Sequence, residues 1–105
     1  MIVVSVLYPA QPGESFDHAY YNETHIPLVK RLWGGLGLRD VQVLRGIDGP
    51  DGAKPTWLAI ALLSFGSVQE FAAAGAQHGK EIFADIANFT RIAPVVQFNE
   101  VVGPT

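Results

Sequence analysis

Three side chains near the start of the chain have the types and the spacing that proton-transfer chemistry needs. Asp17, Tyr21 and His25 follow one another at intervals of four residues, so on a helix they form one line along a single face. An imidazole can take up or release a proton near neutral pH. The phenol could orient a substrate oxygen, and the carboxylate could hold the assembly. The pattern predicts a general acid–base site whose catalytic residues are His25, Tyr21 and Asp17.

The same residues also allow a purely structural interpretation. Pro27 removes a backbone donor, so we expect the helix to kink or restart near His25 and Ile26. Such a break frees backbone carbonyls beside the imidazole. His25 could simply bind one of them, with the Tyr21 hydroxyl in water. The spacing alone leaves both interpretations open.

The two other histidines are weaker candidates. His18 falls in the first turn of the predicted helix and is expected to be solvated. His78 lies between glycines, which predicts a loop, and from there it could point into a cleft. The three histidines match no local pattern of metal ligands and the chain has no cysteine, so we predict neither a metal site nor a cofactor.

Composition places these residues in one small and unusually apolar domain. The chain has 105 residues, which fits a single domain over 1–105. Hydrophobic residues make up 49% and charged residues only 16%, against a usual charged share of about 25%. A net charge of −3 offers no positive stripe for nucleic acid, and no apolar run approaches the roughly 20 residues that span a bilayer. We therefore expect a cytoplasmic protein that binds neither nucleic acid nor membranes.

Hydrophobic periodicity and turn residues predict an alternation of strands and helices. The expected strands are 2–8, 38–46, 57–65 and 95–102, and the expected helices are 16–33, a segment starting at Ser67, and a short helix over 81–88 after a break at Gly75 to Gly79. The order is βαββαβ, the split βαβ pattern of an α+β protein. It predicts a four-stranded antiparallel sheet with both helices on one face.

The uncovered face of this sheet predicts a homodimer. In segments 2–8 and 57–65, both the odd and the even positions are mostly apolar, as in strands that are covered on both faces. The helices cover one face, and a second copy of the chain is the simplest cover for the other. Two stacked sheets would form a barrel-like core. The ligand cleft is then expected between each sheet and its own helices, with an apolar lining suited to a small hydrophobic molecule.

Three stretches of the sequence match segments of a known protein family. The run from Phe16 to Leu28 reads FDHAYYNETHIPL, and the other two stretches are 85–90 and 94–98. The first resembles the first-helix signature of the EthD family, and the other two resemble its closing segment. The resemblance implies a ferredoxin-like fold that forms dimeric α/β barrels. Its superfamily includes cofactor-free isomerases, monooxygenases, and dehydratase- or decarboxylase-like enzymes of small cyclic compounds. In some of them a histidine of the first helix faces the cleft, and here that position is His25, with Tyr21 beside it.

Functions from different classes fit these observations. One is a small cofactor-independent enzyme of catabolism or secondary metabolism, in which His25 shuttles a proton and Tyr21 holds a substrate oxygen. The alternative is a non-catalytic dimer that binds a small hydrophobic ligand or assists a partner oxidase, which the small number of convergent polar groups favours. A structural dimer without a ligand is a third interpretation.

Overall fold

Four strands form one antiparallel sheet in the order β2-β3-β1-β4. A computed structural model describes residues 1–104. The strands are β1 (Ile2–Pro9), β2 (Asp40–Arg45), β3 (Trp57–Phe65) and β4 (Val95–Glu100). Strand β3 has the predicted bounds, whereas β2 and β4 are shorter than predicted. The predicted βαββαβ order and the antiparallel sheet are confirmed.

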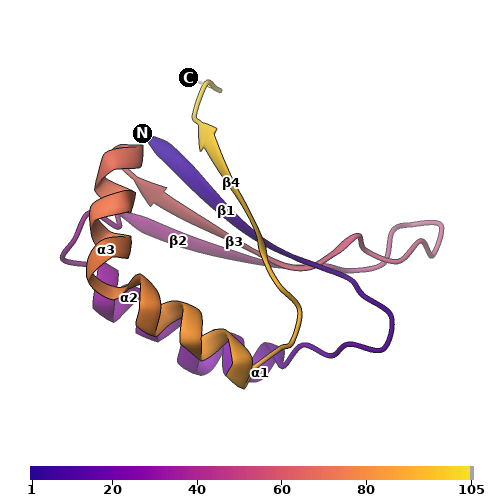
Figure 1. The fold of residues 1–105 in the computed structure, drawn as a ribbon. Coiled ribbons are helices and arrows are strands. Elements are labelled where there is room, and N and C mark those ends of the chain that lie inside the picture. The colour runs from indigo at the N-terminus through magenta and orange to yellow at the C-terminus, as the bar shows by residue number, and fades with distance from the viewer. Residues whose placement is uncertain (105) are drawn as a thin grey trace.

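The helical segments all lie on one face of the sheet (Figure 1). The first arm consists of α1 (His18–Tyr20), a π-helical turn η1 (Tyr21–His25) and α2 (Ile26–Trp33). The second consists of α3 (Val68–Asp85) and a 3₁₀ turn η2 (Ile86–Asn88). No helix within residues 1–104 is long and apolar enough to cross a membrane.

The predicted break in the second helix is wrong. Helix α3 runs without interruption through Gly75 and Gly79, and His78 lies on it rather than in a loop. Its Nδ1 lies 2.9 Å from Glu81 Oε1, one turn further along the same helix. Each glycine costs a helix about 1 kcal/mol relative to alanine, and burial of residues such as Ala74 and Ile82 on this helix offsets that cost.

The hydrophobic core lies between the sheet and the helices. Alternate residues of β1 and β3, including Val4, Tyr8, Leu63 and Phe65, are buried on the helical side. The indole Nε1 of Trp33 donates a hydrogen bond to a backbone carbonyl of α3 at 2.9 Å, which ties α2 to α3. The two arms are therefore linked directly to each other where they pack on the sheet.

Candidate functional site

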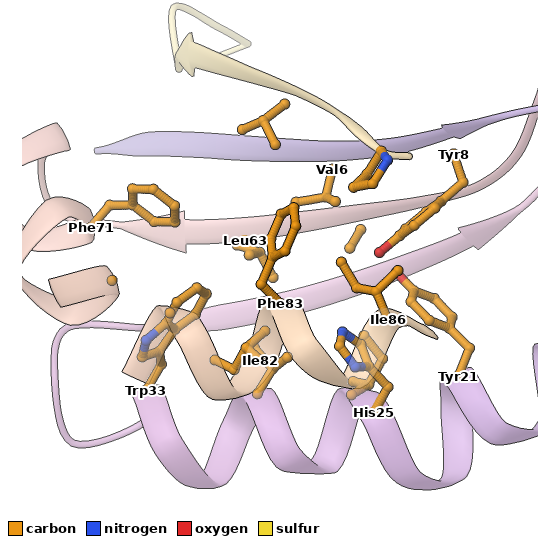
Figure 2. Close-up of a pocket in the computed structure, with 17 residues that line it drawn as sticks. Val6, Tyr8, Tyr21, His25, Trp33, Leu63, Phe71, Ile82, Phe83 and Ile86 are labelled. Atoms are coloured by element: carbon orange, nitrogen blue, oxygen red, sulfur yellow. The ribbon is translucent and has the colours of Figure 1, made fainter. Parts of the chain in front are cut away.

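A cavity of about 280 Å³ lies between the sheet and the helices (Figure 2). Its position agrees with the cleft expected from the sequence. The lining comes from β1, β3, β4 and both helical arms, including the turns η1 and η2. It is almost wholly apolar and consists of Val6, Tyr8, Tyr21, His25, Ile26, Val29, Trp33, Ala61, Leu63, Phe71, Gly75, Gly79, Ile82, Phe83, Ile86, Pro94 and Val96. Only two phenols, one imidazole and one indole bring polar atoms to it. The indole N–H is already committed to the backbone of α3.

The imidazole of His25 is buried and held by a carboxylate from the other helical arm. His25 is 4% exposed, and its Nδ1 lies 2.9 Å from Oδ2 of Asp85. Asp85 is the last residue of α3. The pair therefore bridges the two arms at the edge of the cavity that His25 lines.

Asp85 is fixed by three side chains. Its Oδ1 accepts hydrogen bonds from the Tyr20 hydroxyl at 2.7 Å and from the Asn88 amide at 2.9 Å, while Oδ2 faces His25. Burial on its own raises the pKa of Asp85, but the hydrogen bonds from Tyr20, Asn88 and His25 outweigh it, so the pKa lies below its usual value. The carboxylate is thus ionised at neutral pH and can only accept.

This arrangement sets the tautomer of His25. Because Asp85 can only accept, Nδ1 of His25 must carry a proton and donate it. In the neutral ring, Nε2 is then an acceptor with a free lone pair. Figure 2 shows the ring on the cavity side of the helix, so a molecule in the cavity would meet a base there.

Two tyrosines complete the polar part of the lining. The Tyr21 ring stacks on His25, with centroids 5.7 Å apart and planes 15° from parallel, and Tyr8 meets Tyr21 edge-on at 5.8 Å. Burial raises the pKa of both hydroxyls above the usual value for tyrosine, so both stay protonated at neutral pH. The ring centroid of Phe89 lies 4.7 Å from that of His25 and 5.1 Å from that of Tyr21. This packing limits the movement of the His25 and Tyr21 rings.

The π turn explains how one helix presents Tyr21 and His25 despite Pro27. A proline ring clashes with the carbonyl four residues earlier in a regular α-helix. Here the Ile26 N–H donates to the Tyr21 carbonyl, five residues back, so the helix widens directly before Pro27 and resumes as α2. Single π turns of this kind are frequent at functional sites. The break expected near His25 is therefore a π turn.

The structure brings together two of the three predicted site residues. Tyr21 and His25 line the cavity side by side. Asp17 lies outside it: this exposed residue caps α1, and its Oδ1 accepts a hydrogen bond from the Tyr20 N–H at 3.0 Å. The carboxylate that holds His25 is that of Asp85, so the structure corrects the role given to Asp17.

Sequence reasoning did not foresee Asp85, Tyr20, Asn88 or Tyr8. Asp85 follows His25 by 60 positions, and no local spacing can connect residues that far apart. The one available signal was the resemblance of 85–90 to a family segment, which named the stretch without giving it a role. Tyr8 lies on β1, where it reads as an ordinary core aromatic residue.

This chain is similar to known EthD proteins over most of its length. A model described as the EthD domain matches residues 13–92. An EthD-like protein from Ralstonia eutropha JMP134 is 43% identical, with a TM-score of 0.91 over 99% of this chain and 94% of that one. No protein among those with curated descriptions matches.

Two more distant structures share the fold alone. An ethyl tert-butyl ether (EthD) family protein from Bacillus halodurans C-125 is 19% identical, with a TM-score of 0.66 over 97% of this chain and 99% of that one. A candidate antibiotic biosynthesis monooxygenase from Bordetella bronchiseptica is 15% identical, with a TM-score of 0.65 over 96% of each chain.

Proposed function

The chain belongs to the EthD domain family, and we propose that it is a cofactor-independent enzyme that moves a proton on a small apolar metabolite. One observation carries this proposal. A buried imidazole has its Nδ1 bound to an ionised carboxylate at 2.9 Å, and it lines an otherwise apolar cavity. This is the arrangement that general acid–base catalysis requires of a histidine.

The proposed mechanism uses groups of this chain only. Nε2 of His25 takes a proton from the substrate, and Asp85 stabilises the imidazolium that forms. The Tyr21 hydroxyl donates to a substrate oxygen as negative charge develops there. The apolar lining excludes water, which strengthens these interactions. Return of the proton to the same carbon exchanges its hydrogen with solvent, and return to a different, conjugated atom of the substrate is an isomerisation.

The proposal includes a cytoplasmic homodimer. The sheet face opposite the helices carries a row of apolar side chains that runs across all four strands, one from each: Leu44, Ile60, Leu7 and Val95. A second copy stacked on this face would cover the row and leave the cavity on the helical side accessible.

Hydrogen–deuterium exchange tests the proposed function on several classes of carbon acid at once. Small cyclic ketones, lactones and phenols are incubated with the protein in D2O, and loss of their C–H signals is followed by NMR. We expect exchange above background for at least one class, reduced at least 100-fold in His25→Ala and unchanged in His78→Ala, whose histidine is not part of the cavity lining. Exchange that is the same in His25→Ala as in the wild type contradicts the proposal.

A second candidate is supported by the scarcity of polar groups in the lining. Two phenols and one imidazole are the only side chains with polar atoms available to a ligand there, which also suits a non-catalytic carrier of a hydrophobic molecule or an assistant to an oxidase. Saturable binding that survives His25→Ala, with no His25-dependent exchange, would favour this function over catalysis.

A further inference from the structure

We propose that the cavity selects a neutral molecule of one or two fused apolar rings with a single carbonyl oxygen, which the hydroxyls of Tyr8 and Tyr21 hold together. This inference deepens the proposed function and rests on it. It assigns a substrate class and adds Tyr8, from β1, as a specificity-determining residue.

The two tyrosine hydroxyls of the lining have no hydrogen-bond partner in the described part of the chain. Tyr8 and Tyr21 are each 1% exposed, and neither hydroxyl makes a hydrogen bond within residues 1–104, although the third tyrosine hydroxyl donates to Asp85. Within the same residues, every side-chain nitrogen or oxygen that is fully buried has a hydrogen-bond partner. The two hydroxyls must therefore keep contact with the cavity. Figure 2 shows them directed toward the same part of it.

Two such hydroxyls suit an acceptor oxygen. Burial raises the pKa of both, so each keeps its proton and can donate. A carbonyl oxygen has two lone pairs and accepts from two donors at once. A hydrocarbon would leave both hydroxyls without partners, which is costly in a buried site. The pair therefore favours a carbonyl over an apolar surface.

The absence of charge in the lining disfavours an anion. The lining contains no lysine, arginine, aspartate or glutamate, so an ionised carboxylate or phosphate would enter without a counter-ion and lose its hydration. Behind the lining, the negative Asp85 contacts His25. It would repel an anion further.

The size of the cavity sets the number of rings. Its volume of about 280 Å³ is roughly twice that of the engineered apolar cavity of about 150 Å³ that accepts benzene. It fits a one-ring or fused two-ring molecule.

These groups together define a balanced reaction. Nε2 of His25 removes a proton from the carbon next to the carbonyl. The electron pair of that C–H bond becomes part of a C=C bond, and the carbonyl becomes an enolate whose oxygen receives the two phenolic hydrogen bonds. The imidazolium returns the proton to the same carbon or to a conjugated one. No oxidant or reductant is consumed.

A matched set of three ligands tests the selection. Binding of 2-tetralone, tetralin and 1,2,3,4-tetrahydronaphthalene-2-carboxylate is measured by calorimetry, since they share a fused two-ring system and differ in the group at position 2. We expect 2-tetralone to bind at least tenfold more tightly than tetralin, and the carboxylate to bind most weakly. Tyr8→Phe and Tyr21→Phe should each weaken binding of 2-tetralone about tenfold, and neither should weaken binding of tetralin, because each removes a hydroxyl that tetralin leaves without a partner.

Tyr20→Phe is the matched control for loss of a phenol hydroxyl. Its hydroxyl binds Asp85 and Tyr20 is not part of the lining, so the preference for ketone over hydrocarbon should persist. The proposal is overturned if tetralin binds as tightly as 2-tetralone, if the carboxylate binds best, if none of the three binds, or if both phenylalanine variants keep the preference. Melting temperatures of all variants establish that they are folded.

Hydrogen exchange on bound 2-tetralone separates this inference from the proposed function. Tyrosine-dependent preference for the ketone together with exchange that requires His25 supports both. The same preference without His25-dependent exchange supports the selection of the ligand and refutes the catalytic role.

Discussion

At the scale of single residues, the site depends on one carboxylate that is satisfied from three sides. Tyr20 and Asn88 donate to one oxygen of Asp85, and His25 donates to the other. A carboxylate held in this way cannot turn or take up a proton easily, so it fixes both the ring orientation and the tautomer of His25. The tautomer that turns a free Nε2 toward the cavity is thus set by residues outside the cavity lining.

Asp85→Asn should abolish most proton transfer while the protein stays folded. Tyr20 and Asn88 both donate to one oxygen of Asp85, so the amide oxygen of the variant should take that position and the NH2 group should face His25. Nδ1 of His25 then becomes an acceptor, and the ring proton moves to Nε2, where it blocks the base. We expect His25-dependent exchange to fall roughly 100-fold or more.

Glu81→Gln provides the control for this substitution. Glu81 makes a contact of the same length, 2.9 Å, with His78 on the same helix, but it is exposed and lies outside the cavity lining. Its removal should leave exchange unchanged. Equal effects of the two substitutions would show that the His25–Asp85 pair is only structural.

Acid should destabilise the wild type more than the Asp85→Asn variant. Because the folded-state pKa of Asp85 is lowered, its ionised form stabilises the fold above the unfolded-state pKa of about 4. That contribution is lost as the pH falls through the folded-state pKa. The difference in free energy of unfolding between wild type and Asp85→Asn should therefore shrink below pH of about 4. Urea denaturation at several pH values measures it, and a constant difference would contradict the assignment.

At the scale of elements, two glycines on α3 leave part of the cavity open where other residues would place a side chain. Gly75 and Gly79 lie one turn apart and both line it. A Cβ atom added at either position would meet nothing within 4 Å. Alanine would therefore fit both sites, and the helix would gain from it. Their presence lowers helix stability and widens the cavity.

The variant with both Gly75→Ala and Gly79→Ala should be more stable and bind less well. Each substitution should stabilise the helix by about 1 kcal/mol. In a domain of this size, each kcal/mol of added stability raises Tm by about 4–8 °C. Two added methyl groups crowd a two-ring ligand, at a cost of ~1–3 kcal/mol. Thermal melts and 2-tetralone calorimetry measure the two effects.

Ala76→Gly is the matched control on the same helix. Ala76 is exposed and not part of the lining, so this change should lower the melting temperature and leave binding unaltered. If the double alanine variant binds 2-tetralone as well as the wild type does, the two glycines do not define the ligand space.

The sequence predicts elements well where propensity and burial agree. Segment 57–65 is apolar at both parities and forms the strand with the predicted bounds, because it is central and covered by neighbours on both sides. The break predicted at Gly75 to Gly79 is wrong, since a local pattern reads glycine as a helix end. Such a pattern does not show that packing keeps an 18-residue helix continuous through glycines that line a cavity. Asp85 escaped prediction for a related reason, as its partner is distant in sequence.

At the scale of the whole molecule, the two faces of the sheet differ in what they offer. The helical face carries the core and the cavity. On the opposite face, Ile60 pairs with Leu7 on one side and with Leu44 on the other. Val95, beside Leu7, is 48% exposed. An apolar row of this length is unusual on a surface left to water.

Ile60→Lys should turn the proposed dimer into a monomer. The substitution places a charge at the centre of the apolar row, where a second sheet would have to bury it without a partner. Because Ile60 is half-buried and points away from the cavity, the fold and the His25–Asp85 pair should survive. Sedimentation measures the oligomeric state across a range of concentrations, and His25-dependent exchange reports on the site.

Gln42→Lys separates the apolar row from the rest of that face. Gln42 is exposed on the same side of the sheet, opposite Leu62. Its side chain is already polar, and a lysine at this position can keep its charged end in water. This variant should remain dimeric. Wild-type protein that sediments as a monomer at every concentration would refute the dimer, yet it would leave the cavity chemistry standing, because each copy of the chain contains His25, Asp85 and both phenols.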